Sequence, residues 1–246
     1  MHRLKPLFSD TTHFSTISNI QRCLRTVDFD EIGDKTHYLV FHMLGLFSFR
    51  QWSVQKTIDF WMSFLSHIDL LPDYVTIHPD KYKQWKNLYL SYKVDIKEDP
   101  ECIWSDGQIG GYCTKFYKSD IEIGNIVNTL DTCIDVGFGG ERILSLLGLL
   151  SPLTKQEILI ETINCLLEEK VSIKHSGPGF ILKKLITEVF YMGATHDSAE
   201  FSQVSKSLTQ KIDFFLSNKD KRKFSDKSAQ WWKDTHGLEI SKILRK

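Results

Sequence analysis

The chain has 246 residues and a mass of 28.6 kDa, which allows one large domain or two small ones. Hydrophobic residues make up 41% and charged residues 25%, as in ordinary globular proteins, which excludes disorder for most of the chain. Lys plus Arg and Asp plus Glu balance at 31 each, so net charge alone does not indicate a polyanion-binding protein. Residues 218–246 form a modestly basic tail.

The cysteines and the absence of long apolar segments predict a protein of a reducing, cytoplasmic compartment. The five cysteines are scattered and include no CxxC pair, which predicts neither a zinc site nor a disulfide framework. The first ten residues lack the apolar run of a signal peptide. The longest apolar stretch, Ile143–Leu150, is far too short to span a membrane.

The first part of the chain reads as strands and helices in mixed order. Tyr38–Phe41 and Leu46–Phe49 fit two short strands that meet at a turn around Gly45. Ser53 is a candidate N-cap for a helix that ends before Pro72, with apolar residues at helical spacing. A strand over Tyr74–Ile77 and a short helix over Asp80–Leu90 follow.

Glycines mark the next region as a possible ligand-binding area. Trp104–Thr114 contains three glycines and predicts a loop in which backbone approaches a ligand closely. Ile121–Asn128 and Thr132–Val136 fit strands. A glycine turn at residues 137–140 then leads into an apolar helix over Glu141–Leu147.

After Pro152 the sequence predicts helices only, which places a domain boundary near residue 150. Thr154 and Glu157 form a capping-box pattern at the start of the first helix. Gly177-Pro178-Gly179 is expected to break the chain before a helix over Phe180–Met192, and another helix starts near Ser198. A solvated loop is predicted over Asn218–Lys227, then helical structure over residues 228–246 with a turn at Gly237.

The segment Cys133–Leu144, CIDVGFGGERIL, is the most informative for chemistry. A strand bearing Asp135, a glycine turn and a helix opening with Glu141 and Arg142 would bring a carboxylate, free backbone and a guanidinium together. Asp135 could meet an ammonium group, and Arg142 could meet a phosphate in fork geometry. Taken alone, the segment fits better an ordinary glycine turn with two exposed helix charges, because isolated glycine patterns are weak signals.

Six segments in order resemble class II aminoacyl-tRNA synthetases, specifically the alanyl-tRNA synthetase form. IDVGFGGERIL resembles the family's motif 3, DTGMGLERI, and the run Gln21–Arg25 resembles the start of motif 2. The other four are HMLGLFSF at residues 42–49, EIGNIV at 122–127, GPGFILKK at 177–184 and KDTHG at 233–237, which resemble EMLGNFSF, EIWNLV, GRGYVLRR and YDTYG.

The resemblance implies an α+β protein with an antiparallel sheet flanked by helices, followed by a small all-helical domain. Residues 1–150 would form the catalytic core, and residues 151–246 would resemble the domain that recognises the tRNA acceptor stem. The implied reaction is amino-acid activation, in which a carboxylate attacks the α-phosphate of ATP. Mg²⁺ would arrive with ATP, and no zinc or other metal site is expected.

Site residues follow from the matched positions. Arg25 would bind the α-phosphate, and Arg142 would contact the γ-phosphate and cover the adenine. Asp135 would hold the substrate ammonium with Asn125 as a hydrogen-bonding partner. The remaining implied residues are Val127 and Trp104 as walls of the side-chain pocket and Met43 and Gly139 at the ATP. Each also has a plainer interpretation: Arg25 as a surface charge, Asn125 as a satisfied strand residue and Trp104 as core.

The chain departs from the family in its nucleotide region. No segment matches motif 1, and the motif 2 loop is reduced to Thr26–Lys35. Val40 stands where the family has a phenylalanine that stacks on adenine, so Phe41 or Phe47 would have to replace it. His42 stands where the family has a glutamate, either as a pH sensor or as an ordinary satisfied polar group. Lys115 takes the place of an acid.

In the helical part, Asp234 is retained, either as a base contact or as a helix cap, and His175 takes the place of an asparagine that reads the acceptor stem. Few arginines remain, so tRNA binding would be weak and salt-sensitive. Three hypotheses remain open: a stand-alone enzyme that passes alanine or another small amino acid to a tRNA, a carrier protein or a small molecule; a binding or regulatory paralogue; and one subunit of a split synthetase. No membrane partner is expected, and the sequence does not indicate an oligomeric state.

Overall fold

The computed structural model describes residues 4–27, 29–34, 36–221 and 227–244. The chain divides into two compact units. The sheet unit comprises Met1–Thr26 and Phe41–Pro152, and the helical unit comprises Val27–Val40 and Leu153–Lys246. The segment Val27–Val40 therefore groups with the helices, although the sequence analysis placed it in the first domain.

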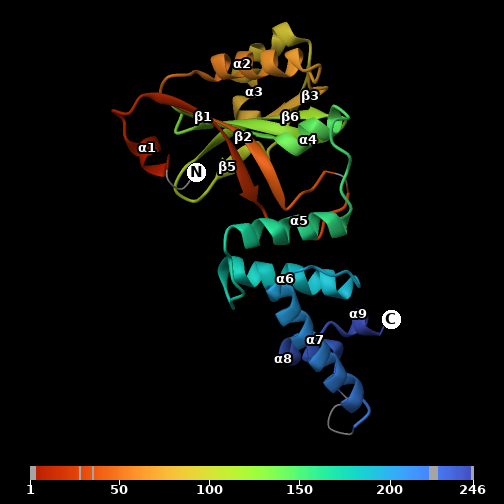
Figure 1. Ribbon diagram of the computed structural model, residues 1–246. Coiled ribbons are helices and arrows are strands. Elements are labelled where there is room, and N and C mark those ends of the chain that lie inside the picture. The colour runs from red at the N-terminus through yellow and green to blue at the C-terminus, as the bar shows by residue number, and fades with distance from the viewer. Residues whose placement is uncertain (1–3, 28, 35, 222–226, 245–246) are drawn as a thin grey trace. The chain divides into compact units, whose positions relative to one another are not determined.

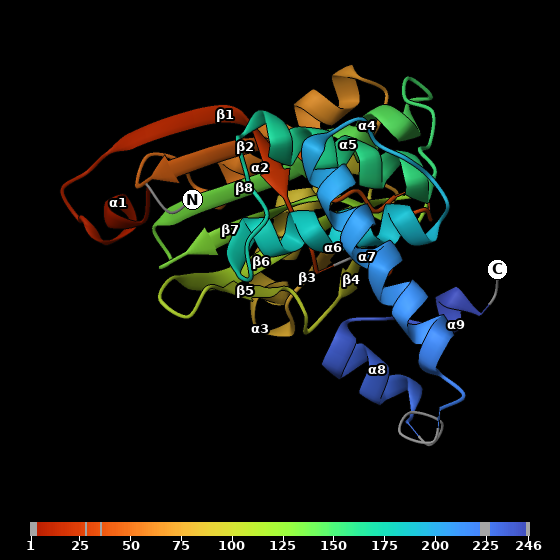
Figure 2. The same cartoon turned by 60° about the horizontal axis from the view of Figure 1, so that its bottom comes forward.

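The sheet unit is built on one large, mostly antiparallel sheet. Its strands lie in the order β1-β2-β8-β7-β6-β3-β4, with β5 paired to β6 off this path (Figure 2). The pairs from β2 to β3 are antiparallel, and β3 and β4 are parallel. The strand bounds are β1 Ser15–Leu24, β2 Val40–Phe49, β3 Tyr74–Ile77, β4 Asp95–Glu98, β5 Ile103–Ser105, β6 Gly110–Lys118, β7 Ile121–Thr129 and β8 Cys133–Gly139.

Helices cover one face of this sheet and form the main core with it (Figure 1). Ser53 caps α2 (Val54–His67) by accepting a hydrogen bond from the backbone of Lys56, as the sequence predicts. The helix turns Trp61 onto Phe138 of β8, with the rings stacked at 4.3 Å between centroids. The other elements on this face are α3 (Pro79–Trp85), the 3₁₀ helix η2 (Lys86–Tyr92) and α4 (Gly140–Leu146).

The opposite face of the sheet carries a smaller apolar cluster. The short helix α1 (Lys5–Ser9) contributes Phe8, whose ring contacts Phe47 and Phe49 of β2 edge-on. Arg50, just after β2, donates to the Leu7 and Phe8 carbonyls and holds α1 there. This cluster covers the sheet face near the end of β2 that contains Phe49.

The helical unit consists of α5 (Lys155–Glu168), α6 (Gly177–Tyr191), α7 (Ala199–Asn218), α8 (Ala229–His236) and α9 (Ile240–Ile243). Helix α6 packs between α5 and α7, and Phe215, Trp232 and Leu238 join α7 to the last helices. The capping box of Thr154 and Glu157 is formed in both directions. In the segment Val27–Val40, Phe29 lies 3.9 Å beneath the Lys184 ammonium.

The α+β organisation predicted from the sequence is confirmed, and three local predictions are wrong. Gly45 is not a turn, because β2 runs unbroken through it opposite Gly137. The predicted loop at Trp104–Thr114 is a hairpin of β5 and β6, in which a Cβ at Gly111 would lie 1.9 Å from the Asn128 carbonyl oxygen. Helix α6 starts at Gly177 instead of after Gly179. Of the predicted loop at Asn218–Lys227, residues 222–226 lie outside the described chain.

Candidate active site on the sheet

Among the predicted site residues of the sheet unit, the strand residues fall on the face opposite the main core; these are Met43, Asn125, Val127, Asp135 and Gly139. Ile134, Val136 and Phe138 of β8 point into that core. Since side chains alternate along a strand, Asp135, Gly137 and Gly139 belong to the other face. That face also carries Phe49 and Cys133 in the α1 cluster, so Asp135 lies next to a packed apolar patch.

Asp135 is a buried carboxylate at the centre of this face. Its side chain is flanked in register by Phe47 on β2 and Val127 on β7, and the residue is 9% exposed. Burial raises the pKa of Asp135 to about 7. Among the described residues, none forms a hydrogen bond or ion pair with its carboxylate. A cationic ligand would therefore gain more here than at an exposed acid.

A row of polar and small residues crosses the sheet beside Asp135. Lys115 pairs with Asn125, Asn125 with Gly137 and Gly137 with Gly45, so four adjacent strands contribute one residue each. Neighbouring side chains approach the two glycines closely, so a Cβ at either position would collide with one of them. A Cβ at Gly45 would lie 2.6 Å from Oδ1 of Asn19, and one at Gly137 would lie 2.8 Å from Sδ of Met43.

Val127 and Trp104 lie at the other side of Asp135, where the resemblance places the walls of a side-chain pocket. Val127 is buried with Cys102 and Cys113, and the half-buried Trp104 packs against all three. Trp104 therefore packs in two small apolar clusters, with Val127 and the cysteines and with the α1 cluster. Its role as a wall of a side-chain pocket stays a prediction.

The sequence analysis missed an ion pair at the end of the polar row. Nζ of Lys115 lies 3.1 Å from Oδ2 of Asp99, and both side chains are mostly buried. Cys102 Sγ contacts the same carboxylate at 3.5 Å and the Thr76 hydroxyl at 2.9 Å. The register of Lys115 with Asn125 follows from the strand alternation, but the Asp99 contact joins segments that no local pattern connects.

Arg142 lies in the first turn of α4, three residues after Gly139, which is the N-cap of that helix. Its Nη1 donates to the Glu122 carbonyl oxygen at 2.8 Å, which fixes the guanidinium beside the start of β7. Met43 of β2 pairs in register with Gly139 of β8. The residues that the resemblance assigns to ATP in motif 3 therefore adjoin the row that contains Gly137.

His42 is held by the acid that precedes Arg142. Oε1 of Glu141 lies 2.8 Å from Nδ1 of His42, and Oε2 accepts the His42 backbone N–H at 2.8 Å. This double contact ties β2 to α4. It favours the interpretation of His42 as a satisfied polar group.

Arg25 follows β1 and is exposed, and its contacts do not decide between phosphate binding and a surface charge. The adenine-stacking role suggested for Phe47 is wrong, because Phe47 is 2% exposed and packed against Phe8. Phe41 is half-buried and remains a candidate.

In the helical unit the two residues assigned to tRNA lie in different settings. His175 lines a pocket of about 250 Å³ together with residues of α6 and α7. Asp234 lies exposed in α8 and accepts a hydrogen bond from Gln230 at 2.8 Å. Asp234 does not cap α8, whose N-cap is Ser228. It is not among the residues that line the His175 pocket.

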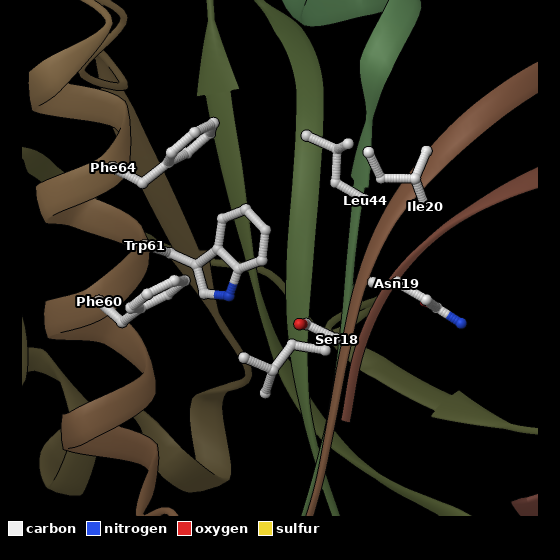
Figure 3. Close-up of a pocket in the computed structure, with 9 residues that line it drawn as sticks. Ser18, Asn19, Ile20, Leu44, Phe60, Trp61 and Phe64 are labelled. Carbon is white, nitrogen blue, oxygen red and sulfur yellow. The ribbon is translucent and has the colours of Figure 1, made fainter. Parts of the chain in front are cut away.

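A larger pocket of about 410 Å³ lies on the helix-covered face, between α2 and the strands β1 and β2 (Figure 3). Phe60, Trp61 and Phe64 form its helix side, and Asn19 points away from it. The indole nitrogen of Trp61 is buried and has no hydrogen-bond partner among the described residues. None of the predicted site residues lines this pocket, but Gly45 of the polar row does.

The described residues contain neither a cluster suited to a metal ion nor a membrane-spanning helix. In that part of the chain, no three His, Cys, Asp or Glu side chains gather where they could hold a metal ion. No helix within the same residues has the length and apolar character needed to cross a bilayer.

Comparisons with known proteins point to one family. Residues 1–106 match the family model for class II (A) tRNA synthetases. The alanine–tRNA ligase of Desulfitobacterium hafniense strain Y51 is 29% identical over 180 residues, covering 64% of this chain and 19% of that ligase. The alanine–tRNA ligase of Tropheryma whipplei strain Twist is 32% identical over 165 residues, covering 52% of this chain and 19% of that ligase.

The matched region spans about a fifth of the length of these two ligases. A solved structure, apo histidyl-tRNA synthetase of S. aureus, aligns with 79% of this chain and 66% of its own, at 10% identity and a TM-score of 0.38. The family-model match ends before Asn125, Asp135 and Arg142. These comparisons therefore leave the roles of those residues to be tested.

Proposed function

We propose that this chain, a relative of the class II alanine–tRNA ligases, activates alanine or another small amino acid with ATP to give an aminoacyl-adenylate. The observation that supports this most directly is Asp135, a buried carboxylate without a partner among the described residues. Binding an ammonium group would ionise it fully and offset the cost of burying its charge.

The rest of the amino-acid site is proposed from the neighbours of Asp135. The Asn125 amide would hydrogen-bond the substrate, and Val127 and Trp104 would border its side chain. The patch around Val127 is packed with buried cysteines, which favours a small side chain. Lys115 does not repel the ammonium strongly, because Asp99 neutralises it at 3.1 Å.

In the proposed reaction a carboxylate oxygen of the amino acid attacks the α-phosphorus of ATP. An oxygen–phosphorus bond forms as the bond to the leaving pyrophosphate breaks. Arg25 would stabilise the charge on the α-phosphate, and Arg142 would bind the γ-phosphate and cover the adenine, with Met43 and Gly139 beside it. Mg²⁺ would enter with the nucleotide and neutralise its phosphates.

The acyl acceptor is proposed more broadly as a tRNA, a carrier protein or a small molecule. His175 and Asp234 are the candidates for contact with a tRNA acceptor stem. The test of activation is exchange of radiolabelled pyrophosphate into ATP, screened over all amino acids. Exchange dependent on alanine or another small amino acid is expected, and no exchange with any amino acid would rule the reaction out.

A second candidate function is amino-acid binding without catalysis. The burial of Phe47 under Phe8 favours it, because that ring is unavailable to stack on adenine. Isothermal titration with amino acids distinguishes the two functions. Tight amino-acid binding combined with absent exchange would support the binding protein over the enzyme.

A further inference from the structure

The pocket of the helical unit collects hydrogen-bond donors from three places in the chain. It is lined by the segment before α6, by α6 and by α7, and its volume is about 250 Å³. The polar residues that line it are Lys174, His175, Lys183, Gln203, Ser207 and Lys211. The lining contains no aspartate or glutamate.

The lysines of this pocket lack counter-charges. Lys183 and Lys211 are half-buried, and neither they nor Lys174 forms an ion pair with a described residue. By contrast, Lys242 of the same unit is half-buried and lies 2.6 Å from Glu188. Burial and the nearby charge of Lys183 both lower the pKa of Lys211. A bound anion would remove the repulsion between these two ammonium groups.

We infer that Lys174, Lys183 and Lys211 form a binding site for a single phosphate group. A phosphate offers several acceptor oxygens and a charge near −2, which matches a pocket lined by ammonium, amide and hydroxyl donors. The volume suits one phosphate with water better than a whole nucleotide, since pockets for drug-sized ligands measure roughly 300–1,000 Å³. The group would be free phosphate or pyrophosphate, or the terminal phosphate of an RNA.

This inference does not depend on the proposed activation reaction, whose residues lie in the sheet unit. The experiment titrates the full chain by calorimetry with inorganic phosphate and pyrophosphate. It also uses two RNA hairpins of identical sequence, with and without a 5′-phosphate. Each probe is applied to the unchanged chain, to Lys183→Gln and Lys211→Gln, and to Lys206→Gln as control. Lys206 is exposed on the same helix as Lys211 but does not line the pocket.

Lys183→Gln and Lys211→Gln should each weaken phosphate binding about ten- to hundredfold, the size of losing one charge-assisted hydrogen bond. Lys206→Gln should change it little. Tighter binding of the 5′-phosphorylated hairpin would assign the site to an RNA end, and equal binding of the hairpins with tight pyrophosphate binding would assign it to the free anion. Phosphate should also raise the melting temperature of the unchanged chain but not of the pocket variants. No phosphate binding, or equal losses in all three variants, would overturn the inference.

Discussion

The chemistry proposed for the sheet face depends on how single residues are placed. Asp135 lies between Phe47 and Val127, and Arg142 is oriented by the Glu122 carbonyl. Neither placement could be derived from the segment CIDVGFGGERIL, because burial is set by the neighbouring strands. The sequence indicated the carboxylate and the guanidinium, and the sheet supplies the environment that gives the carboxylate a pKa of about 7.

Asp135→Asn should stabilise the ligand-free protein at about pH 8 and leave it nearly unchanged at about pH 4. The folded-state pKa of about 7 lies above the ordinary 3.8, so the unfolded chain loses this proton first. Stability therefore falls as pH rises between those two values, by about 1.4 kcal/mol per pH unit, and the asparagine removes that loss. Urea unfolding at the two pH values measures the effect.

The same substitution should raise the KM for the amino acid about ten- to hundredfold and change ATP binding little. The ammonium would lose a charged partner, while the phosphate contacts would stay. A variant with impaired ATP affinity and normal amino-acid affinity would show that Asp135 has a structural role.

Arg142→Ala should reduce pyrophosphate exchange by about two to three orders of magnitude, the size of losing one preorganised donor. The side chain is half-buried and makes a hydrogen bond to the Glu122 carbonyl, so a stability loss of only about 1 kcal/mol is expected. Thermal unfolding controls for misfolding. An unchanged exchange rate in a well-folded variant would refute the assignment of Arg142 to ATP.

At the scale of strands and helices, glycines near the site fill two different roles. Gly137 faces the site row, where an added Cβ would meet only the flexible end of Met43 at 2.8 Å. Gly124 on β7 faces the core, where a Cβ would lie 2.3 Å from the Phe138 ring. Alanine substitutions at these two positions therefore form a matched pair. One tests whether the glycine borders the ligand site, and the other tests its role in core packing.

Gly137→Ala should preserve stability to within about 1 kcal/mol and raise the substrate KM about tenfold, because the methyl group narrows the site row. Gly124→Ala should do the reverse, with a stability loss of about 1–3 kcal/mol from overpacking. Denaturant unfolding and exchange kinetics on both variants provide the readouts. If Gly137→Ala left the KM unchanged, Gly137 would not border the ligand site.

The same elements show why local patterns predict some structure and not the rest. The caps at Ser53, Thr154 and Ser198 were predictable because a cap is satisfied within one helical turn. Gly45 was mistaken for a turn residue. A glycine is needed there because Asn19, on the neighbouring strand β1, approaches the backbone closely, and no local pattern shows this contact. The Lys115–Asp99 pair was missed for the same reason, since it depends on the sheet bringing distant segments together.

At the scale of the whole molecule, the division into two units fits a separation of activation from acceptor binding, which stays a prediction. The segment Val27–Val40 groups with the helices although it follows β1 in the chain, so the sequence boundary near residue 150 describes only part of the division. A contact such as Phe29 with Lys184 joins residues far apart in sequence. Neither composition nor periodicity could have revealed it.

If the helical unit binds tRNA, it should do so loosely and without strict reading of the alanine acceptor stem. The net formal charge of the chain is zero, and His175, in place of the family's asparagine, lines a pocket with three lysines, which suits contacts to phosphates. Binding through phosphates is sequence-independent and weakens steeply with salt. We expect dissociation constants of about 1–100 µM at physiological salt, with alanine and non-alanine tRNAs competing about equally in filter-binding assays. A sharp loss of affinity on changing one acceptor-stem base pair would contradict this, because it would require direct base contacts, for which exposed Asp234 is the remaining candidate.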